Sequence, residues 1–386
     1  MAKRKRYKLR NADKSKVAGD FVLTILVLGL VVFGIMMVFS ASYYWALRND
    51  GSAYTYLIKD GIYAVIGLGI FLFLASFNYH KLAHLALPIL IASIVLLCIL
   101  LPFGKSLNNA TRWLQVGPIT FMPGEFAKFA AILFTAWFLS RDKQKILSFK
   151  EGIAPLVLLA GIYGILIMMQ PNMSTAITVC GIIFGIMFMA GLQWRWIIGV
   201  GAIGSAAGLL LIFGDEDGYR LKRVTSFMDP FADAKDTGYQ VVQSLLALGS
   251  GGFFGKGLGK SIEKYLYLPE PQNDFILAII GEELGYIGIV LLMIAYMLLI
   301  WRGFHIAVRA KDQFGCLLAS GITFMIAIQV VMNVAVATSS MPPTGVTLPF
   351  VSYGGNALWL FMGSAGILLN ISRHPAEEYI SDDEEE

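Results

Sequence analysis

The sequence is poor in charge and in the residue types that build disulfide or metal scaffolds. Only 15% of its 386 residues are charged, against about a quarter in a typical soluble domain, which argues against both a water-soluble and a disordered chain. The three cysteines, Cys98, Cys180 and Cys316, each lie inside an apolar run, so we expect small buried side chains and no disulfide framework. The four histidines show no metal-ligand spacing, which argues against a zinc site.

Apolar residues, by contrast, make up 57% of the chain and lie in blocks. Several blocks reach the ~20 residues that a helix needs to cross a bilayer. We therefore predict an all-α, polytopic membrane protein with about ten transmembrane helices and a large extracellular loop between helices 7 and 8. The predicted spans are 20–42, 56–77, 82–102, 123–140, 152–170, 173–192, 196–213, 274–301, 315–337 and 353–371.

Charge is distributed unevenly along the chain and predicts its orientation. Residues 1–18 form a basic tail, residues 374–386 an acidic tail, and residues 19–373 the transmembrane domain. The first apolar run is too long for a signal peptide, so we expect an uncleaved helix. Lys and Arg concentrate in alternate short connections, which places both termini in the cytoplasm and the loop 214–273 outside. A topology signal with anionic-lipid contact explains the basic tail without nucleic-acid binding.

The loop 214–273 has roughly sixty residues, and loops of this length usually have a function. Residues 239–248 are amphipathic and predict a helix. In the glycine-rich stretch 249–261 that follows, Phe254 stands where a P-loop requires glycine, which disfavours a nucleotide-binding motif. With Lys256 nearby, the backbone amides of this stretch could cradle a phosphate or diphosphate, and a flexible turn is an equal alternative.

Few ionisable residues lie at membrane depth, where a charge is costly and usually functional. Glu125 and Lys128 are separated by about 60° around one helix, so they can form an ion pair, either structural or functional. Asp274 lies at the outer end of the eighth span, where partial desolvation can raise a carboxyl pKa toward values that suit a general base. The alternative is an acid that stabilises the helix N-terminus. By helical rotation, at most one of Glu282 and Glu283 shares its cavity.

Further candidates lie in the outer loops. Arg112 stands beside Trp113 in the loop 108–118. The planar guanidinium of Arg112 can bind a phosphate through two N–H groups. Anchoring at the membrane interface is sufficient to explain Trp113. Arg223 adds positive charge to the large loop, where a solvated face is the simpler interpretation. The loop 341–355 is rich in proline and glycine, and irregular backbone at this depth is tolerated only where it lines protein or a cavity.

Three sets of motifs are characteristic of one family. They are Tyr239-Gln240; Asn273-Asp274-Phe275 with Gly281-Glu282-Glu283-Leu284-Gly285; and Thr344-Gly345 with Leu348-Pro349-Phe350-Val351-Ser352-Tyr353-Gly354-Gly355. Arg112-Trp113, Pro123-x-Glu125-x-x-Lys128 and Gln170-Pro171 add to them. Through these motifs the chain resembles, over residues 20–375, the SEDS family (shape, elongation, division and sporulation), the FtsW/RodA polytopic glycosyltransferases of bacterial peptidoglycan synthesis. Asn172 departs from the family pattern, which usually has aspartate at this position.

The resemblance implies an activity and a location. Similar proteins polymerise lipid II into undecaprenyl-diphosphate-linked glycan strands at the outer face of the bacterial cytoplasmic membrane. They work with a class B penicillin-binding protein, a transpeptidase, and with divisome or sporulation membrane proteins. Ser40-Ala-Ser42 and Thr347-Leu-Pro are closer to the division or sporulation branch than to the elongation branch. The implied enzyme is an inverting peptidoglycan glycosyltransferase, and the alternatives are a lipid II flippase and a non-catalytic scaffold for the transpeptidase.

The resemblance also implies residue roles. Asp274 is the expected catalytic base, and a divalent cation, Mg²⁺ or Mn²⁺, is expected on the donor diphosphate, with Asp274 as its candidate ligand. The candidate substrate-binding residues are Arg112, Glu125, Lys128, Arg223, Gln240, Lys256, Ser352, Gly354 and Gly355.

Overall fold

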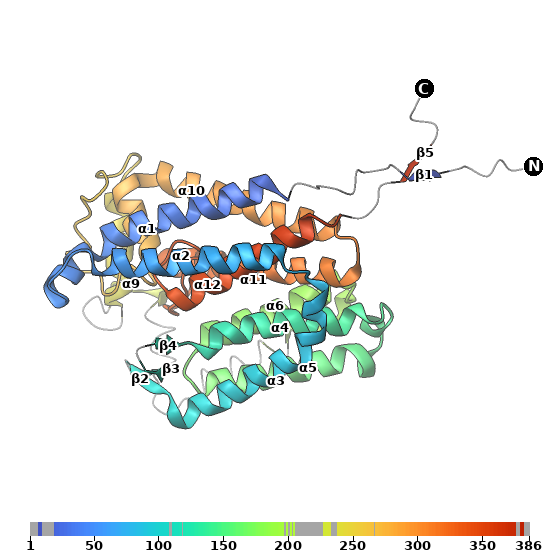
Figure 1. Cartoon of the computed structure of the whole chain (residues 1–386). Helices are drawn as coiled ribbons and strands as arrows, with labels where there is room; N and C mark the ends of the chain where they lie inside the picture. The colour runs from blue at the N-terminus through green and yellow to red at the C-terminus, as the bar shows by residue number, and fades with distance from the viewer. Residues whose placement is uncertain are drawn as a thin grey trace, which may run out of the picture.

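In the computed structural model the chain forms a bundle of long helices with short strands at its two ends (Figure 1). The structure describes residues 7–9, 19–107, 110–117, 119–196, 198–199, 201–202, 204, 227–232, 238–265, 267–375 and 379–381. The helices are α1 (Phe21–Asn49), α2 (Thr55–Ser76), α3 (His80–Phe103), α4 (Pro123–Ser140), α5 (Ala154–Met168), α6 (Met173–Met189), α9 (Tyr239–Ser250), α10 (Ile276–Val308), α11 (Gln313–Ala337) and α12 (Gly355–Ser372). A 3₁₀ turn (Lys145–Leu147) and a π turn (Phe149–Ile153) lead into α5.

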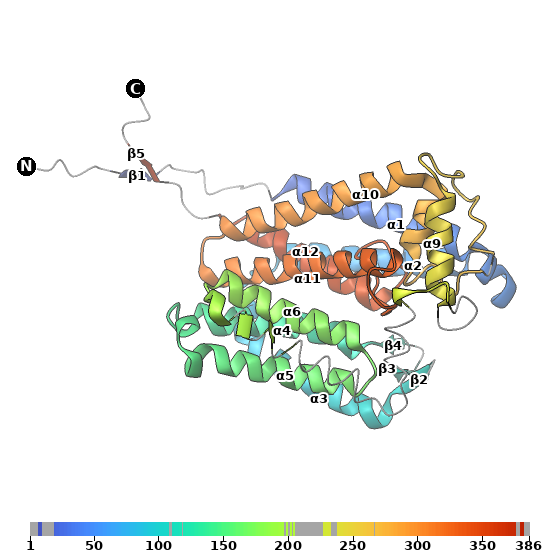
Figure 2. The ribbon, with the colours of Figure 1, turned by 180° about the vertical axis from the view of Figure 1, so that it is seen from behind.

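Helices α11 and α12 form the centre of the bundle. In each of them 72% of the most apolar 18-residue segment is buried, against 17% in α2. Helix α12 packs along α2, and α11 packs along α10, while α4 and α6 cover another side of α11. Helices α3 and α5 complete that half of the molecule (Figure 2). The peripheral helices leave large apolar side chains exposed, such as Val65 and Phe73 of α2, as expected where lipid surrounds the protein.

The prediction of an all-α, polytopic membrane fold is confirmed. By length and composition, seven helices of the described part can span a membrane: α1, α2, α3, Phe149–Met168, α10, α11 and α12. Helix α6 is apolar but has 17 residues, α4 carries two charges, and most of the predicted span 196–213 lies outside the described residues. The expectation of buried cysteines is wrong for Cys98, which is exposed on α3, and Cys180 and Cys316 are only half-buried. Full burial is not required here, because an apolar side chain in a bilayer is also stable against lipid.

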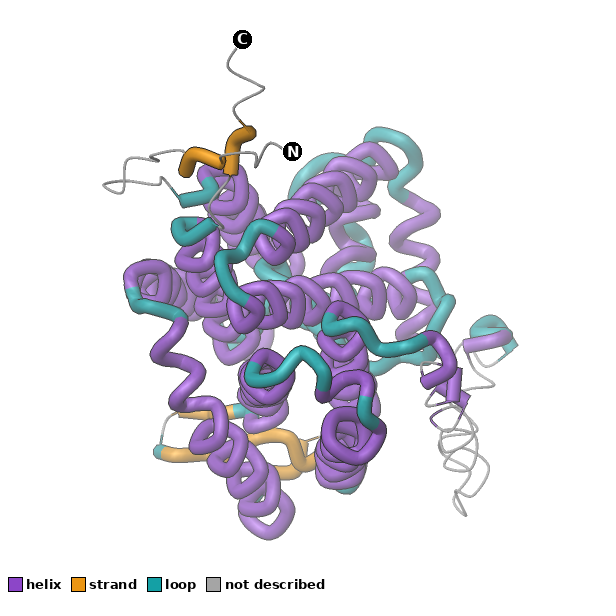
Figure 3. Tube along the Cα trace, turned by 90° about the vertical axis from the view of Figure 1, so that its right-hand side faces the viewer, coloured by secondary structure: helices purple, strands orange, loops and turns teal. Residues whose placement is uncertain are grey.

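Two small antiparallel sheets, which the sequence did not predict, lie at opposite ends of the bundle (Figure 1). Figure 3 shows their strands in orange. Strands β2 (Lys105–Leu107), β3 (Ala110–Val116) and β4 (Ile119–Phe121) form the connection between α3 and α4. We call this end of the bundle the sheet end. Strand β1 (Tyr7–Leu9) pairs with β5 (Tyr379–Ser381). This pair of strands lies toward the other end of the bundle, which we call the tail end.

Helix α10, the longest in the described part, is bent near its start. At Gly285 the backbone has φ 70° and ψ −169°, a conformation that is essentially restricted to glycine. The helix continues to Val308, beyond the predicted boundary at residue 301, since no proline interrupts it. The helix predicted over residues 239–248 is confirmed as α9, which packs against α10. The glycine-rich stretch lies between these two helices in the chain.

Candidate functional site

Asp274 lies two residues before the first residue of α10, and its nearness to Arg112 of strand β3 places it at the sheet end. Its backbone is held from α11, because the side-chain amide of Asn333 donates to the carbonyl oxygens of Asp274 (3.1 Å) and Val346 (2.7 Å). Asn333 is fully buried. A single side chain of α11 therefore joins the start of α10 to the loop 341–355.

The side chains of Asp274 and Arg112 meet at Gly345. A Cβ atom placed on Gly345 would lie 3.2 Å from Oδ2 of Asp274 and 3.4 Å from Nη1 of Arg112. Gly345 also has a φ of 69°, in the left-handed region that favours glycine. Both the backbone conformation and the close approach of two charged groups thus require a residue without a side chain here.

Two hydrogen bonds add further segments to this arrangement. Nη2 of Arg112, on β3, donates to the backbone oxygen of Pro171 (2.8 Å) in the turn between α5 and α6. The hydroxyl of Ser174, in the first turn of α6, donates to the backbone oxygen of Thr344 (2.8 Å). Four segments that are distant in the sequence therefore converge at the sheet end. We call Asp274, Arg112, Gly345 and Asn333 the Asp274 site.

The surroundings of Asp274 raise the pKa of its carboxyl from 3.8 to about 6. Burial is the main cause, since desolvation disfavours the charged form, and the negative charge of Glu270 adds to it. The positive charge of Arg112 lowers this pKa and partly offsets the two effects. Such a carboxyl is mostly deprotonated at neutral pH but more basic than an ordinary aspartate, which is what a general base requires.

The predicted ion pair within α4 is confirmed. Nζ of Lys128 lies 2.6 Å from Oε1 of Glu125, and the two side chains are 4% and 9% exposed. A Cβ on the neighbouring Gly124 would lie 3.3 Å from Cγ2 of Thr175, so the pair is located where α4 packs against the start of α6. The second carboxylate oxygen of Glu125 has no partner among the described residues. A role of the pair in substrate binding stays a prediction.

The glycine-rich stretch and the residues after it pack on the bend of α10 through two ion pairs. Lys256 Nζ lies 2.7 Å from Oε1 of Glu282, and Lys264 Nζ lies 2.9 Å from Oε1 of Glu283. Both glutamates are fully buried. We call these four residues the clasp. Lys256, a predicted diphosphate ligand, is thus paired with a buried protein carboxylate of α10, and its side chain is 28% exposed.

The remaining predicted residues occupy other positions. The hydroxyl of Ser352 accepts a hydrogen bond from a backbone N–H four residues earlier (2.8 Å) and so stabilises its own loop. Gly354 caps α12, and a Cβ on Gly355 would lie 3.0 Å from a tyrosine ring of α2, so these glycines permit close packing. Gln240 is exposed on α9, and Arg223 lies outside the described residues.

Several buried polar residues of the membrane spans are absent from the predicted set, among them Asn333, Gln329 and Asp60. Asn333 holds Asp274, as described above. Gln329, one turn earlier in α11, is fully buried, and its amide has no hydrogen-bond partner among the described residues. Asp60 of α2 is 4% exposed, and its Oδ1 has no partner in the described part either. Each of them is a polar residue inside an apolar run. Because such residues are costly at membrane depth, the sequence did contain a signal that they are structurally or functionally important.

The described residues include no group of three or more His, Cys, Asp or Glu side chains that could hold a metal ion. A divalent cation would therefore depend on Asp274 and on oxygen atoms of a bound ligand, a donor set that Mg²⁺ accepts.

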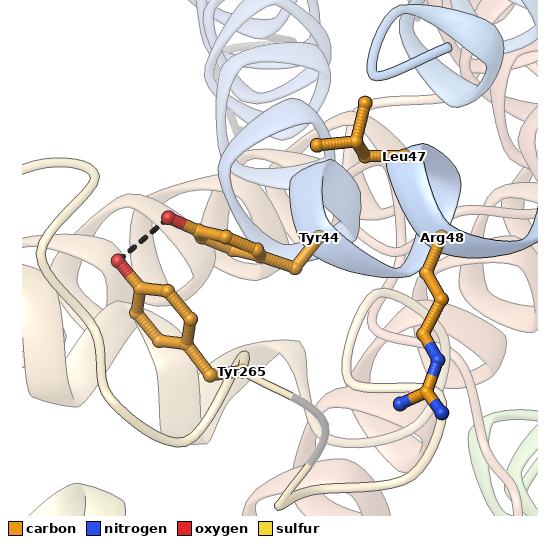
Figure 4. A pocket seen from close by; sticks show the side chains of 4 residues that line it. All are labelled: Tyr44, Leu47, Arg48 and Tyr265. Atoms are coloured by element: carbon orange, nitrogen blue, oxygen red, sulfur yellow. Dashed lines mark hydrogen bonds between the residues drawn. The ribbon is translucent and has the colours of Figure 1, made fainter. Parts of the chain in front are cut away.

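A separate cavity of about 210 Å³ lies between the end of α1 and the segment after the glycine-rich stretch. It is lined by Tyr44, Leu47, Arg48 and Tyr265 (Figure 4). None of these four belongs to the Asp274 site. The hydroxyls of Tyr44 and Tyr265 are hydrogen-bonded at 2.8 Å and join α1 to the residues beside the clasp.

Known proteins resemble this chain over nearly its whole length. A family model described as "Cell cycle protein" (FtsW/RodA/SpoVE) matches residues 21–377. Stage V sporulation protein E of Bacillus subtilis (strain 168) is 39% identical over 93% of this chain and 98% of its own length. The probable peptidoglycan glycosyltransferase FtsW of Geobacter sp. (strain M18) is 36% identical over 92% of this chain and 96% of its own length. A solved chain from a peptidoglycan synthase complex that coordinates polymerization and crosslinking has a TM-score of 0.77 and 28% identity, over 93% of this chain and 98% of its own.

Proposed function

The chain belongs to the FtsW/RodA/SpoVE family, and on that premise we propose that it is a peptidoglycan glycosyltransferase that polymerises lipid II at the Asp274 site. The main support is that the Asp274 carboxylate and the Arg112 guanidinium both approach Gly345. A base and a phosphate-binding group are the two parts that sugar transfer from a lipid diphosphate requires. The relatives named as peptidoglycan glycosyltransferases support the same reaction.

In the proposed reaction, a sugar hydroxyl of the acceptor attacks the anomeric carbon of a donor sugar that is bonded to undecaprenyl diphosphate. Asp274 takes the hydroxyl proton while the new C–O bond forms. The bond to the diphosphate breaks with its electron pair on the departing oxygen. Because the acceptor oxygen attacks from the opposite face, the configuration of the anomeric carbon inverts. Arg112 stabilises the negative charge on the leaving diphosphate. Asp274 is the residue that would help to hold Mg²⁺ or Mn²⁺, and such a cation would supply further neutralisation of that charge.

The proposal extends to location and partners. The chain is a multi-pass membrane protein, and we infer that both tails are cytoplasmic and the sheet end faces outward. This orientation puts the Asp274 site on the side of the membrane where the glycan strands are assembled. We further infer a class B penicillin-binding protein as partner, together with divisome or sporulation membrane proteins. The similar chain in a complex that combines polymerization with crosslinking supports such a pairing.

The test is polymerisation of labelled lipid II by the purified full chain with a class B penicillin-binding protein and Mg²⁺, followed by gel analysis of the products. We expect Asp274→Asn to bind lipid II but to form no long strands, since loss of a general base typically costs about 10²–10⁴-fold in rate. The matched control is Asp142→Asn, which changes an exposed carboxylate at the tail end and should keep full activity.

Two outcomes would contradict the proposal. A wild-type yield of polymer from Asp274→Asn would remove the base role of this residue. A lack of polymer from the unmodified chain, with partner and metal supplied, would instead favour a lipid II flippase or a scaffold for the transpeptidase. The binding control separates these cases from a variant that has simply lost its substrate.

A further inference from the structure

A cavity of about 450 Å³ opens at the tail end, between the start of α3 and the end of α4. Its lining consists of Ala83, His84, Leu87, Pro88, Trp137 and Arg141. Helices α3 and α4 both continue from here to the β2–β4 sheet at the other end of the bundle. The cavity is therefore separated from the Asp274 site by the full length of these helices and belongs to the opposite membrane surface.

Arg141 is the charged group of this cavity, and it is held in place by an aromatic ring. The guanidinium carbon lies 5.0 Å from the ring centroid of Trp137, one helical turn earlier, in a cation–π contact. No carboxylate of the described residues lies within ion-pair distance of Arg141. The cation is exposed, and its planar fork matches the oxygen atoms of a phosphate. His84 supplies a second polar group from α3, the facing helix.

The rest of the lining is apolar and at least partly exposed, which a site for free phosphate would not need. Leu87 is 46% exposed, and Ala83 and Pro88 lie beside it on α3. The neighbouring Leu85 and Ile91 are also exposed, at 43% and 54%. A ligand that fills this cavity therefore meets a cation at one edge and a hydrocarbon surface at the other. This combination matches an acyl chain with a phosphate at its end.

The local charge favours an anionic lipid over a neutral one. Segment 141–151 carries four basic residues against two acidic ones, and Lys81 adds a further cation in the first turn of α3. Basic pockets between transmembrane helices on the cytoplasmic side are typical binding sites for anionic lipid headgroups. We propose that this cavity binds an anionic phospholipid, with its headgroup phosphate on Arg141 and His84 and its acyl chain along Leu87 and Pro88.

The test is native mass spectrometry of the full chain in detergent, titrated with phosphatidylglycerol, with phosphatidylcholine, or with inorganic phosphate. We expect phosphatidylglycerol to bind more tightly than phosphatidylcholine, and inorganic phosphate not to compete at equal concentration. Arg141→Gln should weaken phosphatidylglycerol binding about ten-fold or more, the usual range for loss of a hydrogen bond to a charged group. Arg141→Lys keeps the charge without the fork and should show a smaller loss.

The matched control is Arg195→Gln, at the same end of the bundle. Arg195 also lies over a tryptophan ring, that of Trp196 at 5.6 Å, but it does not line the cavity. An equal loss in Arg141→Gln and Arg195→Gln, or no loss in Arg141→Gln, would overturn the proposal. Equal affinity for the two lipids in the unmodified chain would overturn it as well, and this last comparison does not depend on the folding of any variant.

Discussion

The carboxyl of Asp274 gives the proposed reaction a measurable pH dependence. Because a general base must be deprotonated, and the pKa of Asp274 is raised to about 6, the polymerisation rate should rise with pH through about 6 and level off above it. Below that value we expect the rate to fall about ten-fold per pH unit. Initial rates of lipid II polymerisation between pH 5 and 8 measure this rise, which we call the acidic limb of the pH–rate profile. A flat profile across pH 6 would show that Asp274 does not titrate in the reaction.

Removing the charge of Glu270 or of Arg112 should shift the acidic limb of the pH–rate profile in opposite directions. Glu270 raises the pKa of Asp274, so Glu270→Gln should shift the limb to lower pH while leaving the plateau nearly unchanged. Arg112 lowers the pKa, so Arg112→Gln should shift the limb to higher pH. The Arg112 variant should also lower the plateau, because it removes the proposed diphosphate contact.

The Glu125–Lys128 ion pair is buried, and its two members should be coupled in stability. Lys128→Met leaves a carboxylate without its partner in a low-dielectric region, which costs about 3–5 kcal/mol. Glu125→Gln with Lys128→Met removes both charges and should recover much of that loss. Unfolding of the single and double variants in detergent measures the coupling. Simple additivity of the two single effects would mean that the pair contributes no net interaction.

At the scale of an element, the bend of α10 depends on Gly285. A Cβ at this position would lie 2.3 Å from the backbone nitrogen of Gly255, and the φ of 70° with ψ of −169° is strained for any other residue. Gly285→Ala should therefore destabilise the protein by about 1–3 kcal/mol from backbone strain alone, with more from the clash. It should also increase hydrogen exchange in the glycine-rich stretch, which packs on this bend.

The control for this prediction is Gly249→Ala in α9, where the backbone is helical and no atom beyond its chain neighbours and the adjacent helix backbone lies within 4 Å of the added Cβ. Because alanine favours a helix by about 1 kcal/mol over glycine, this variant should be neutral or slightly more stable. Thermal unfolding of the two variants side by side gives the comparison. Equal stability of both would mean that the bend of α10 accepts a side chain.

At the scale of the whole molecule, the two ends of the bundle should face opposite sides of the membrane. With the native cysteines replaced, Lys260→Cys lies in the exposed glycine-rich stretch at the sheet end, and Lys143→Cys lies in the exposed connection after α4 at the tail end. We expect a membrane-impermeant thiol reagent added to intact cells to label the first and not the second. The reverse pattern would place the Asp274 site in the cytoplasm and contradict the proposed reaction.

Local spacing and long apolar runs let the sequence alone determine the class of fold, most of the spans, helix α9 and the Glu125–Lys128 pair. The reason is physical: residues three or four apart in a helix share one face whatever the rest of the chain does. The family resemblance was also readable, since its motifs are contiguous segments. Asn333 and Asp60 were within reach of the same reasoning, because each interrupts an apolar run.

Only the tertiary structure decided which distant segments meet. The approach of Asp274 and Arg112 to Gly345, the two bonds from Asn333, and the pairing of Lys256 with Glu282 each join residues from different elements. Their geometry depends on how helices pack against one another, and no periodicity along the chain contains that information. The prediction that Lys256 binds a diphosphate shows the same limit. The sequence shows the charge of Lys256, but the buried carboxylate of Glu282 that pairs with it lies on a helix that only the fold brings beside it.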